Sequence, residues 1–218
     1  MPARALEPSG IILVDKPAGP SSFAIVAAVR RRTRARTGHA GTLDPFATGL
    51  LLLLSGAATK LQPRFVGLDK RYVTEIDLTT RTSTGDLEGD VVDVHGAPDA
   101  EELEEWLAEL RGDVELRIPA ASAVKIGGER AYRLHRRGVA VEMPVRRMTV
   151  HALRVLGYED GMLALDVLVS SGTYVRALAD ALGGHCTSLR RTEIGPFTIE
   201  EADPERIIPA SEAQARLG

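Results

Sequence analysis

One histidine and one carboxylate stand five residues apart in RTGHAGTLDPFATG, residues 36–49, a stretch that leads directly into five leucines. Asp44 precedes Pro45, whose ring restricts the chain after the carboxylate, so a single acid is held rigidly at the start of a buried segment. Asp before Pro is also common in ordinary turns, and on this motif alone a turn is the favoured interpretation. His39 has no second histidine or carboxylate at metal-ligand spacing, which argues against a metal site.

Other kinds of catalytic site find little support in the sequence. No serine lies in a G-x-S-x-G elbow, and neither common phosphate-binding glycine pattern occurs. Cys186 is the only cysteine, which excludes an internal disulfide, a Cys-based zinc site and a CxxC pair, and it is expected to be a small buried residue. Arg176, in SGTYVRALAD, falls on the first turn of an apolar helix, where a long cation usually snorkels or caps.

The composition predicts a soluble globular protein with an uneven charge. Apolar residues make up 44% of the chain, no apolar run approaches about 18 residues, and the N-terminal residues do not resemble a signal peptide, so we expect a cytoplasmic protein. Residues 1–71 hold 11 Lys and Arg against 4 Asp and Glu, residues 72–115 hold 2 against 14, and residues 116–154 hold 9 against 2. The net charge of −3 therefore says nothing against a polyanionic partner, because nucleic acid responds to clustered Lys and Arg, although RRRTRAR (residues 30–36) is equally compatible with a solvated surface.

The elements that must position Asp44 can be read from the first seventy residues. GIILVDKPAG predicts a short buried strand closed by a turn, and SSFAIVAAVRRR predicts a helix capped by Ser21 or Ser22. Its apolar positions recur at helical spacing: Phe23, Val26 and Val29. The Asp44 motif is expected to be a loop, and LLLLLSG a strand buried on both faces. AATKLQPRFVG begins like a helix, with its continuation past the proline left open.

The rest of the chain predicts strands that pair with sequence neighbours. RYVTEIDLTT alternates with Tyr72 on the inward face, and RTSTGDLEGD is a polar turn before GDVVDV, a strand that can pair back. PDAEELEEWLAELRG predicts a helix with a capping box, and a short helix is expected near residues 129–137. The remaining predicted elements are the strand pair VRRMTVHALRVL and MLALDVLVSS, the helix TYVRALADALGG, and the strand pair in SLRRTEIGPFTI. This order predicts an α+β fold with a mixed, mainly antiparallel sheet.

Six segments in order resemble the bacterial tRNA pseudouridine synthase B family. They are GIILVDKPAGPSSF, GHAGTLDPFATGLLLLLSGAATK, KRYVTEIDLTTRTSTGDLEGD, SAVKIGGERAYRLHRRG, SGTYVRALADALG and SLRR. The resemblance implies the pseudouridine synthase fold, with a central mixed sheet flanked by helices and loops. It also implies one catalytic domain over residues 1–218, an RNA-clamping insertion around 118–147, and no C-terminal PUA-like domain of the kind that family members usually carry.

The resemblance implies the isomerisation of uridine-55 in the T loop of tRNA to pseudouridine. Asp44 would be the nucleophile, and the resemblance leaves open whether it attacks uracil C6 or ribose C1′. Arg176 matches the family's active-site arginine and would pair with Asp44. Tyr72 matches the tyrosine that stacks on the flipped base and can abstract a proton later.

Other matched positions would bind the substrate. His39 resembles the histidine that fills the space left by the flipped base, and Lys16 the lysine beside the active site. Tyr174 and Leu189 match pocket positions that hold the uracil, and Thr42 belongs to the same Gly-Thr-Leu-Asp motif. The family implies a monomeric enzyme that needs no metal or cofactor, binds the T-arm stem-loop of tRNA and has no membrane partner.

Two alternatives remain open at this point. The absence of the usual C-terminal domain, and a segment AASAVK that lacks the family's tyrosine, favour a non-catalytic tRNA-binding or folding factor. A pseudouridine synthase that acts on a different RNA uridine is the other alternative. The four residues at the chemical centre keep the family's spacing, which favours catalysis: Asp44, His39, Tyr72 and Arg176.

Overall fold

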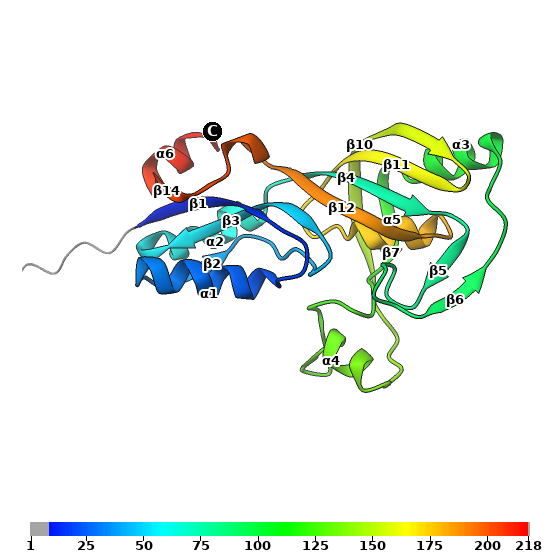
Figure 1. Cartoon of the computed structure of the whole chain (residues 1–218), viewed down its shortest axis with the longest axis horizontal. Coiled ribbons are helices and arrows are strands. Elements are labelled where there is room, and N and C mark those ends of the chain that lie inside the picture. Colours follow the sequence, from blue (N-terminus) through cyan, green and yellow to red (C-terminus); the bar gives the residue numbers. More distant parts are fainter. Residues whose placement is uncertain (1–8, 218) are drawn as a thin grey trace, which may run out of the picture. The chain divides into compact units, whose positions relative to one another are not determined.

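Two compact units make up the chain in the computed structural model, which describes residues 9–217 (Figure 1). Unit 1 contains Met1–Val73 and Leu189–Gly218, and unit 2 contains Thr74–Ser188. Strands β4 (Lys70–Asp77) and β12 (His185–Ile194) each contribute residues to both units. That the two units act as one catalytic domain stays a prediction.

Unit 1 is built on the leucine-rich strand β3 (Thr48–Ser55), which lies antiparallel to β1 (Gly10–Lys16). β14 (Asp203–Pro209) pairs with β1, and the end of β12 runs parallel to β3. The short strand β2 (Thr37–His39) also pairs with β3, so the stretch expected to be a loop begins with a strand. The other elements of the unit are α1 (Ser22–Thr33), η1 (Gly56–Leu61), α2 (Gln62–Val66), β13 (Phe197–Thr198), η2 (Ile199–Glu201) and α6 (Ala210–Ala215).

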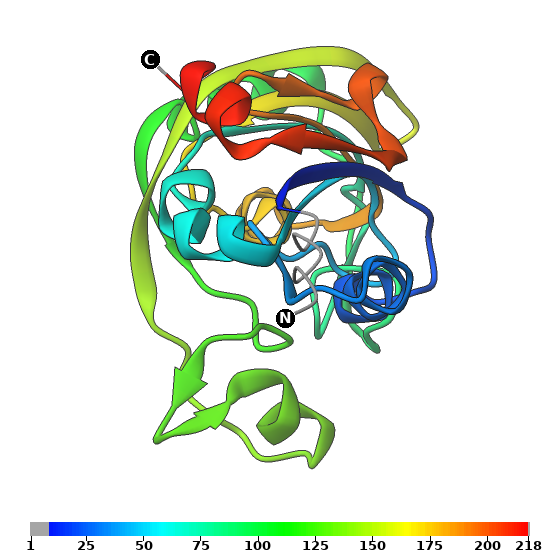
Figure 2. The same ribbon diagram turned by 90° about the vertical axis from the view of Figure 1, so that its left-hand side faces the viewer.

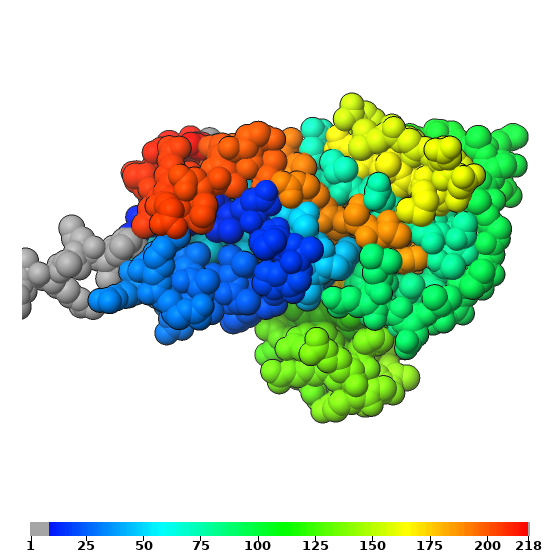
Figure 3. Space-filling view, viewed as in Figure 1, coloured from blue at the N-terminus to red at the C-terminus, as the bar shows by residue number. Residues whose placement is uncertain are grey.

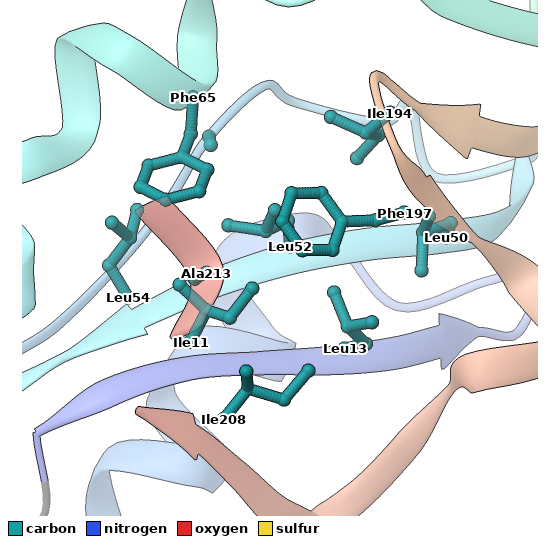
Figure 4. Packing of buried hydrophobic residues seen from close by; sticks show 11 residues of the cluster. Ile11, Leu13, Leu50, Leu52, Leu54, Phe65, Ile194, Phe197, Ile208 and Ala213 are labelled. Carbon is teal, nitrogen blue, oxygen red and sulfur yellow. The ribbon is translucent and has the colours of Figure 1, made fainter. Parts of the chain in front are cut away.

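Strands β1 and β3 are buried on both faces, as their continuous apolar sequences predict. One face packs against α1 through Ile12, Val14, Val26, Val29, Leu51 and Leu53. The other face packs against α2 and α6, and Figure 4 shows its members Ile11, Leu13, Leu50, Leu52, Leu54, Phe65, Phe197, Ile208 and Ala213. Fully burying a leucine contributes about 1.5–3 kcal/mol, so these strands form a firm base for the loop that precedes β3.

Helix α1 begins where the sequence predicts, because the side chain of Ser21 accepts a hydrogen bond from the backbone N–H of Ala24. Val26 and Val29 are buried as expected, but the placement of Phe23 on the apolar stripe is wrong, since its side chain is 77% exposed. The buried stripe starts at Ser22 instead, one residue earlier on the helix.

Unit 2 is organised around the hairpin of β10 (Val145–Glu159) and β11 (Met162–Val169). β7 (Gly112–Arg117) pairs with β10, and the unit 2 part of β4 lies next to β11. The segment GDVVDV pairs back as expected, as β6 (Val91–Val94). Its partner is β5 (Thr80–Thr82), a separate strand that lies mostly within the stretch expected to be a polar turn, and not the strand β4 that precedes it. The helices α3 (Ala100–Glu109), with its Asp99–Glu102 capping box, and α5 (Val175–Ala181) complete this part of the unit.

The segment near residues 118–147 extends away from β7 and β10 (Figures 1 and 2) and forms a lobe in the space-filling view (Figure 3). It holds the hairpin β8 (Lys125–Ile126) and β9 (Glu129–Arg130), followed by α4 (Ala131–Arg136). The predicted α+β class with mixed, mainly antiparallel strand pairing is confirmed. None of the helices within residues 9–217 has both the length and the apolar character needed to cross a membrane.

Candidate active site

The loop that carries Asp44 joins β2 to β3 in unit 1 and is fixed on one side by Ser22. The Ser22 hydroxyl donates to the carbonyl of Leu43 at 2.8 Å and accepts from the N–H of Leu43 at 2.9 Å. The residue immediately before Asp44 is therefore held by both of its backbone polar groups. Ser22 is 1% exposed and lies in the first turn of α1, so the helix itself sets the position of the carboxylate.

Lys16, at the end of β1, fixes the other side of the same loop. Its ammonium group donates to the carbonyls of Pro45 at 3.1 Å and Ala47 at 2.6 Å, and to that of Pro17 at 2.9 Å. Burial lowers the pKa of Lys16, the charge of Asp44 opposes that effect, and the charge of Arg191 adds to it. Lys16 is thus a buried cation under the loop, in agreement with its predicted place near Asp44.

Arg191 is a residue of this site to which the sequence assigned no role. It is 1% exposed, and its guanidinium donates to the carbonyls of Leu50 at 2.7 Å and Gly41 at 3.2 Å. The same group lies 6.0 Å from the ring centroid of Tyr72. Arg191 therefore connects the first half of the loop, the start of β3 and the predicted stacking tyrosine.

The position of Arg191 follows from the parallel pairing of β12 with β3. Arg191 lies opposite Gly49, whose φ of +101° suits glycine, and a Cβ there would lie 2.2 Å from the Arg191 carbonyl oxygen. Alternation along SLRR puts Arg191 on the same strand face as the buried Leu189. The sequence signal that could have identified Arg191 is its place as a cation on a strand face whose neighbouring residue is buried.

Lys70 and His39 also have lowered proton affinity. The pKa of Lys70 falls to about 8, mainly through burial and then through the charge of Arg191, which Asp69 opposes. Burial and the charge of Arg191 also lower the pKa of His39. The Nδ1 atom of His39 is buried without a hydrogen-bond partner, and its ring meets that of Phe23 edge-on at 6.1 Å between centroids. A neutral, ring-packed histidine is better suited to filling space than to moving protons.

Arg176 occupies the first turn of α5 in unit 2, where Tyr174 is the N-cap residue. Its expected snorkelling or capping role is wrong, because the side chain is 2% exposed. The guanidinium contacts a carboxylate oxygen of Asp86 at 3.2 Å and donates to the carbonyls of Thr84 at 2.6 Å and Ala121 at 2.9 Å. These partners hold Arg176 in one orientation.

Asp86 is the second residue to which the sequence assigned no role. The stretch expected to be a polar turn contains this 4% exposed carboxylate. Asp86 accepts hydrogen bonds from the hydroxyl of Thr84 at 2.6 Å and the N–H of Glu88 at 3.0 Å. Each buried charge in this pair meets an opposite charge and further polar groups, as burial of ions requires.

The predicted site residues fall into two groups by unit. Unit 1 holds Lys16, His39, Thr42, Asp44, Tyr72 and Leu189, and unit 2 holds Tyr174 and Arg176. Tyr72 and Leu189 are each 7% exposed, whereas Asp44 is half-buried and Thr42 is exposed. The pairing of Arg176 with Asp44 and the roles of all eight residues stay predictions. Within residues 9–217, no group of three or more His, Cys, Asp or Glu side chains is placed to hold a metal ion.

Comparisons with known proteins point to one family. Residues 30–175 match the TruB family pseudouridylate synthase (N terminal domain). The chain is 45% identical over 208 residues to tRNA pseudouridine synthase B of Mycobacterium sp. (strain KMS), covering 89% of this chain and 70% of that protein. It is 42% identical over 219 residues to the protein of that name from Aromatoleum aromaticum (strain DSM 19018 / LMG 30748 / EbN1), covering 96% and 70%.

The fold is also similar to a chain in the crystal structure of a Cbf5-Nop10-Gar1 complex, with a TM-score of 0.67 and 27% sequence identity. The similarity covers 91% of this chain and 52% of the other, so this chain spans about half of that protein's length.

Proposed function

The chain belongs to the TruB family of pseudouridylate synthases, and from this premise we propose that it isomerises uridine-55 in the T loop of tRNA to pseudouridine. Relatives that bear the name tRNA pseudouridine synthase B, at 42–45% identity over most of this chain, support tRNA as the substrate. The observation that carries the proposal is the fixed presentation of Asp44 by Ser22 and Lys16.

The reaction requires one carboxylate and no outside reactant. Asp44 attacks uracil C6 or ribose C1′, and the bond between N1 and C1′ breaks. The base then turns, C5 bonds to C1′, and the bond between Asp44 and the substrate breaks, which regenerates the free carboxylate. The proton on C5 leaves, and N1 gains a proton. Product and substrate have the same composition, so the isomerisation needs neither an oxidant nor a hydrolytic water.

The surroundings of Asp44 fit this work. Lys16 and Arg191 bring positive charge to the loop, while their hydrogen bonds to backbone carbonyls keep the carboxylate aimed. Correct aim matters because a reacting group held in a near-attack position avoids much of the entropic barrier. In the proposed complex Arg176, already fixed by Asp86, adds a further positive charge for the same carboxylate.

A uridine in a folded T loop must leave its stack before Asp44 can reach it, at a free-energy cost of a few kcal/mol. In the proposal Tyr72 receives the flipped base, and His39 occupies the space that the base leaves. Stacking returns roughly 1–3 kcal/mol per base, which is comparable with the cost of flipping. Burial, and then the charge of Arg191, lowers the pKa of His39, which favours a neutral ring at this position.

Replacing Asp44 by asparagine tests the proposal. We expect Asp44→Asn to reduce the rate of pseudouridine formation in a tRNA transcript by on the order of 10³-fold or more while RNA binding persists. Asp15→Asn is the matched control, because it removes an exposed carboxylate of the neighbouring strand whose partner is Arg190. The assay maps pseudouridine at nucleotide resolution.

Three outcomes would count against parts of the proposal. Full activity of Asp44→Asn would remove Asp44 as the nucleophile. Pseudouridine at another position, or in another RNA, would show that the enzyme acts on a substrate other than uridine-55 of tRNA. A wild-type chain that binds tRNA and forms no pseudouridine would support the non-catalytic binding factor.

A further inference from the structure

A groove of about 460 Å³ runs along one side of α1 in unit 1, next to Thr37 of β2. Its lining consists of Phe23, Val26, Ala27, Arg30, Arg31, Arg34 and Thr37. Most of these residues recur at helical spacing and form one stripe, about 16 Å long at 1.5 Å per residue. The residues of α1 form an uncovered blue surface in Figure 3. No acidic residue lines the groove.

Phe23 is an exposed aromatic side chain at one end of this groove. It is 77% exposed, although a phenylalanine on a helix usually faces the core. Its ring meets the ring of His39 at 6.1 Å, and the adjacent Ser22 holds the residue before Asp44. The aromatic end of the groove is therefore the end nearest the candidate active site.

Arginines occupy the other end of the groove. Arg32 forms an ion pair with Glu205, but the side chains of Arg30, Arg31 and Arg34 make no hydrogen bond or ion pair with the described residues. Arg34 caps α1 with a φ of +52°, a left-handed conformation that glycine or asparagine usually takes at this position. An arginine at a strained cap suggests that its charge has a use outside the helix.

We propose that the α1 groove binds RNA, and specifically the substrate strand as it leaves the candidate active site. One base stacks on Phe23, and successive phosphates meet Arg30, Arg31 and Arg34. Aromatic side chains beside clustered cations are the combination that binds single strands independently of sequence. This inference rests on the proposed function for the identity of the RNA, but the groove is separate from the residues that perform the chemistry.

Two variants separate the stacking contact from the phosphate contacts. Arg30→Gln/Arg34→Gln removes two charges and keeps long, helix-compatible side chains. We expect the slope of log K against log salt for tRNA to fall in magnitude by about 1.4–1.8, at 0.7–0.9 per phosphate. Phe23→Ala leaves the core intact, and we expect it to weaken binding roughly fivefold or more without changing the slope. Binding is measured with Asp44→Asn as the parent, so that no product forms.

Lys60→Gln/Arg64→Gln is the matched control. It removes two exposed cations of unit 1 that do not line the groove, so the salt slope should stay at the parent value. An equal fall in slope for the control pair would show a general charge effect and overturn the proposal. Unchanged affinity and slope for both groove variants would also overturn the proposal. The groove would then be assigned to a different partner, such as an acidic protein.

Arg34→Gly distinguishes RNA binding from a purely structural role. Glycine suits the left-handed cap, so the melting temperature should stay the same or rise, while the salt slope falls by about 0.7–0.9. A lower melting temperature with an unchanged slope would assign Arg34 to the helix end alone. Pseudouridine formation by the wild-type chain tests the proposed function separately. An active wild type whose groove variants bind like the parent contradicts only the groove.

Discussion

Lys16 and Arg191 are buried cations that bond backbone carbonyls around Asp44. Burying a charge is costly, and these two residues offset the cost with hydrogen bonds to carbonyls of the loop and of β3. The same bonds set the shape of the loop. The groups that bring positive charge to the nucleophile are therefore also the groups that position it, so substitutions at either residue will affect geometry and charge together.

Replacing Lys70 by methionine should change how stability depends on pH. The pKa of Lys70 is lowered from 10.5 to about 8, mainly because the ammonium is buried. Between these values the unfolded chain binds a proton that the folded chain has lost, so this group makes the wild type more stable as pH rises. We expect the free energy of unfolding of the wild type, relative to Lys70→Met, to increase by on the order of 1–3 kcal/mol from pH 7 to pH 10.5.

Urea unfolding at several pH values measures this difference. Lys60→Met is the control, since it removes an exposed lysine of the same unit and should follow the wild-type pH profile. Parallel stability curves for the wild type and Lys70→Met would show that Lys70 keeps the same proton affinity in the folded and unfolded chains.

At the scale of elements, Gly49→Ala should separate β3 from β12. A Cβ at Gly49 would lie 2.2 Å from the carbonyl oxygen of Arg191 and would require φ of +101° from alanine. We expect a loss of roughly 2–5 kcal/mol in the free energy of unfolding. Pseudouridine formation should fall as well, because a displaced β12 withdraws the Arg191 guanidinium from Gly41.

Gly38→Ala is the matched control for this prediction. Gly38 belongs to β2, which also pairs with β3, and a Cβ there would have no atom within 4 Å. Denaturation and activity of Gly38→Ala should stay close to the wild type. Equal damage from both substitutions would mean that the loss comes from the added methyl group in any strand next to β3, rather than from the β3–β12 contact.

Local patterns predicted most elements of this chain. The apolar runs of β1 and β3, the Ser21 cap of α1 and the Asp99 capping box of α3 each depend on neighbours within one element. Where the prediction failed, the outcome depended on distant residues. Phe23 fits the helical spacing, but Ser22 is buried because it binds Leu43.

Pairing between distant segments also explains why the sequence assigned no role to Arg191 and Asp86. Arg191 is placed by the register of β12 against Gly49, and Asp86 by the packing of its turn against Arg176. Neither contact leaves a periodic signal in the sequence, since each joins segments separated by 90 or more positions. The family resemblance supplied Asp44, Tyr72, Arg176 and Lys16 as candidates. The roles of Ser22, Arg191 and Asp86, which hold these residues or their loop, follow only from contacts in the folded chain.

For the whole molecule, unit 2 is an insertion within unit 1. The chain leaves unit 1 after Val73, inside β4, and returns at Leu189, inside β12. Residues from the returning segment complete the larger apolar cluster on β1 and β3: Ile194, Phe197, Ile208 and Ala213. Unit 1 therefore lacks part of its core until the last segment is present.

A chain cut after Ser188 should consequently aggregate. The cut removes β13, β14 and α6 and uncovers the part of the leucine strand's face that they cover, while α2 stays in place. Exposed apolar strands associate readily. The measurement is the monomeric fraction of the purified chain by analytical ultracentrifugation. Co-expression of residues 189–218 as a separate peptide should restore monomers. A monomeric truncated chain with native hydrogen exchange in β3 would contradict this account.

The insertion also has a consequence in time during synthesis. The 115 residues from Thr74 to Ser188 separate the two halves of unit 1 in the chain. At about 5–20 residues per second, a ribosome needs roughly 6–23 s to make them. During that interval one face of the nascent leucine strand is only partly covered, while Asp44 is already in the chain and Arg191 is not. We therefore expect a chaperone that shields apolar strands to bind the growing polypeptide until translation ends.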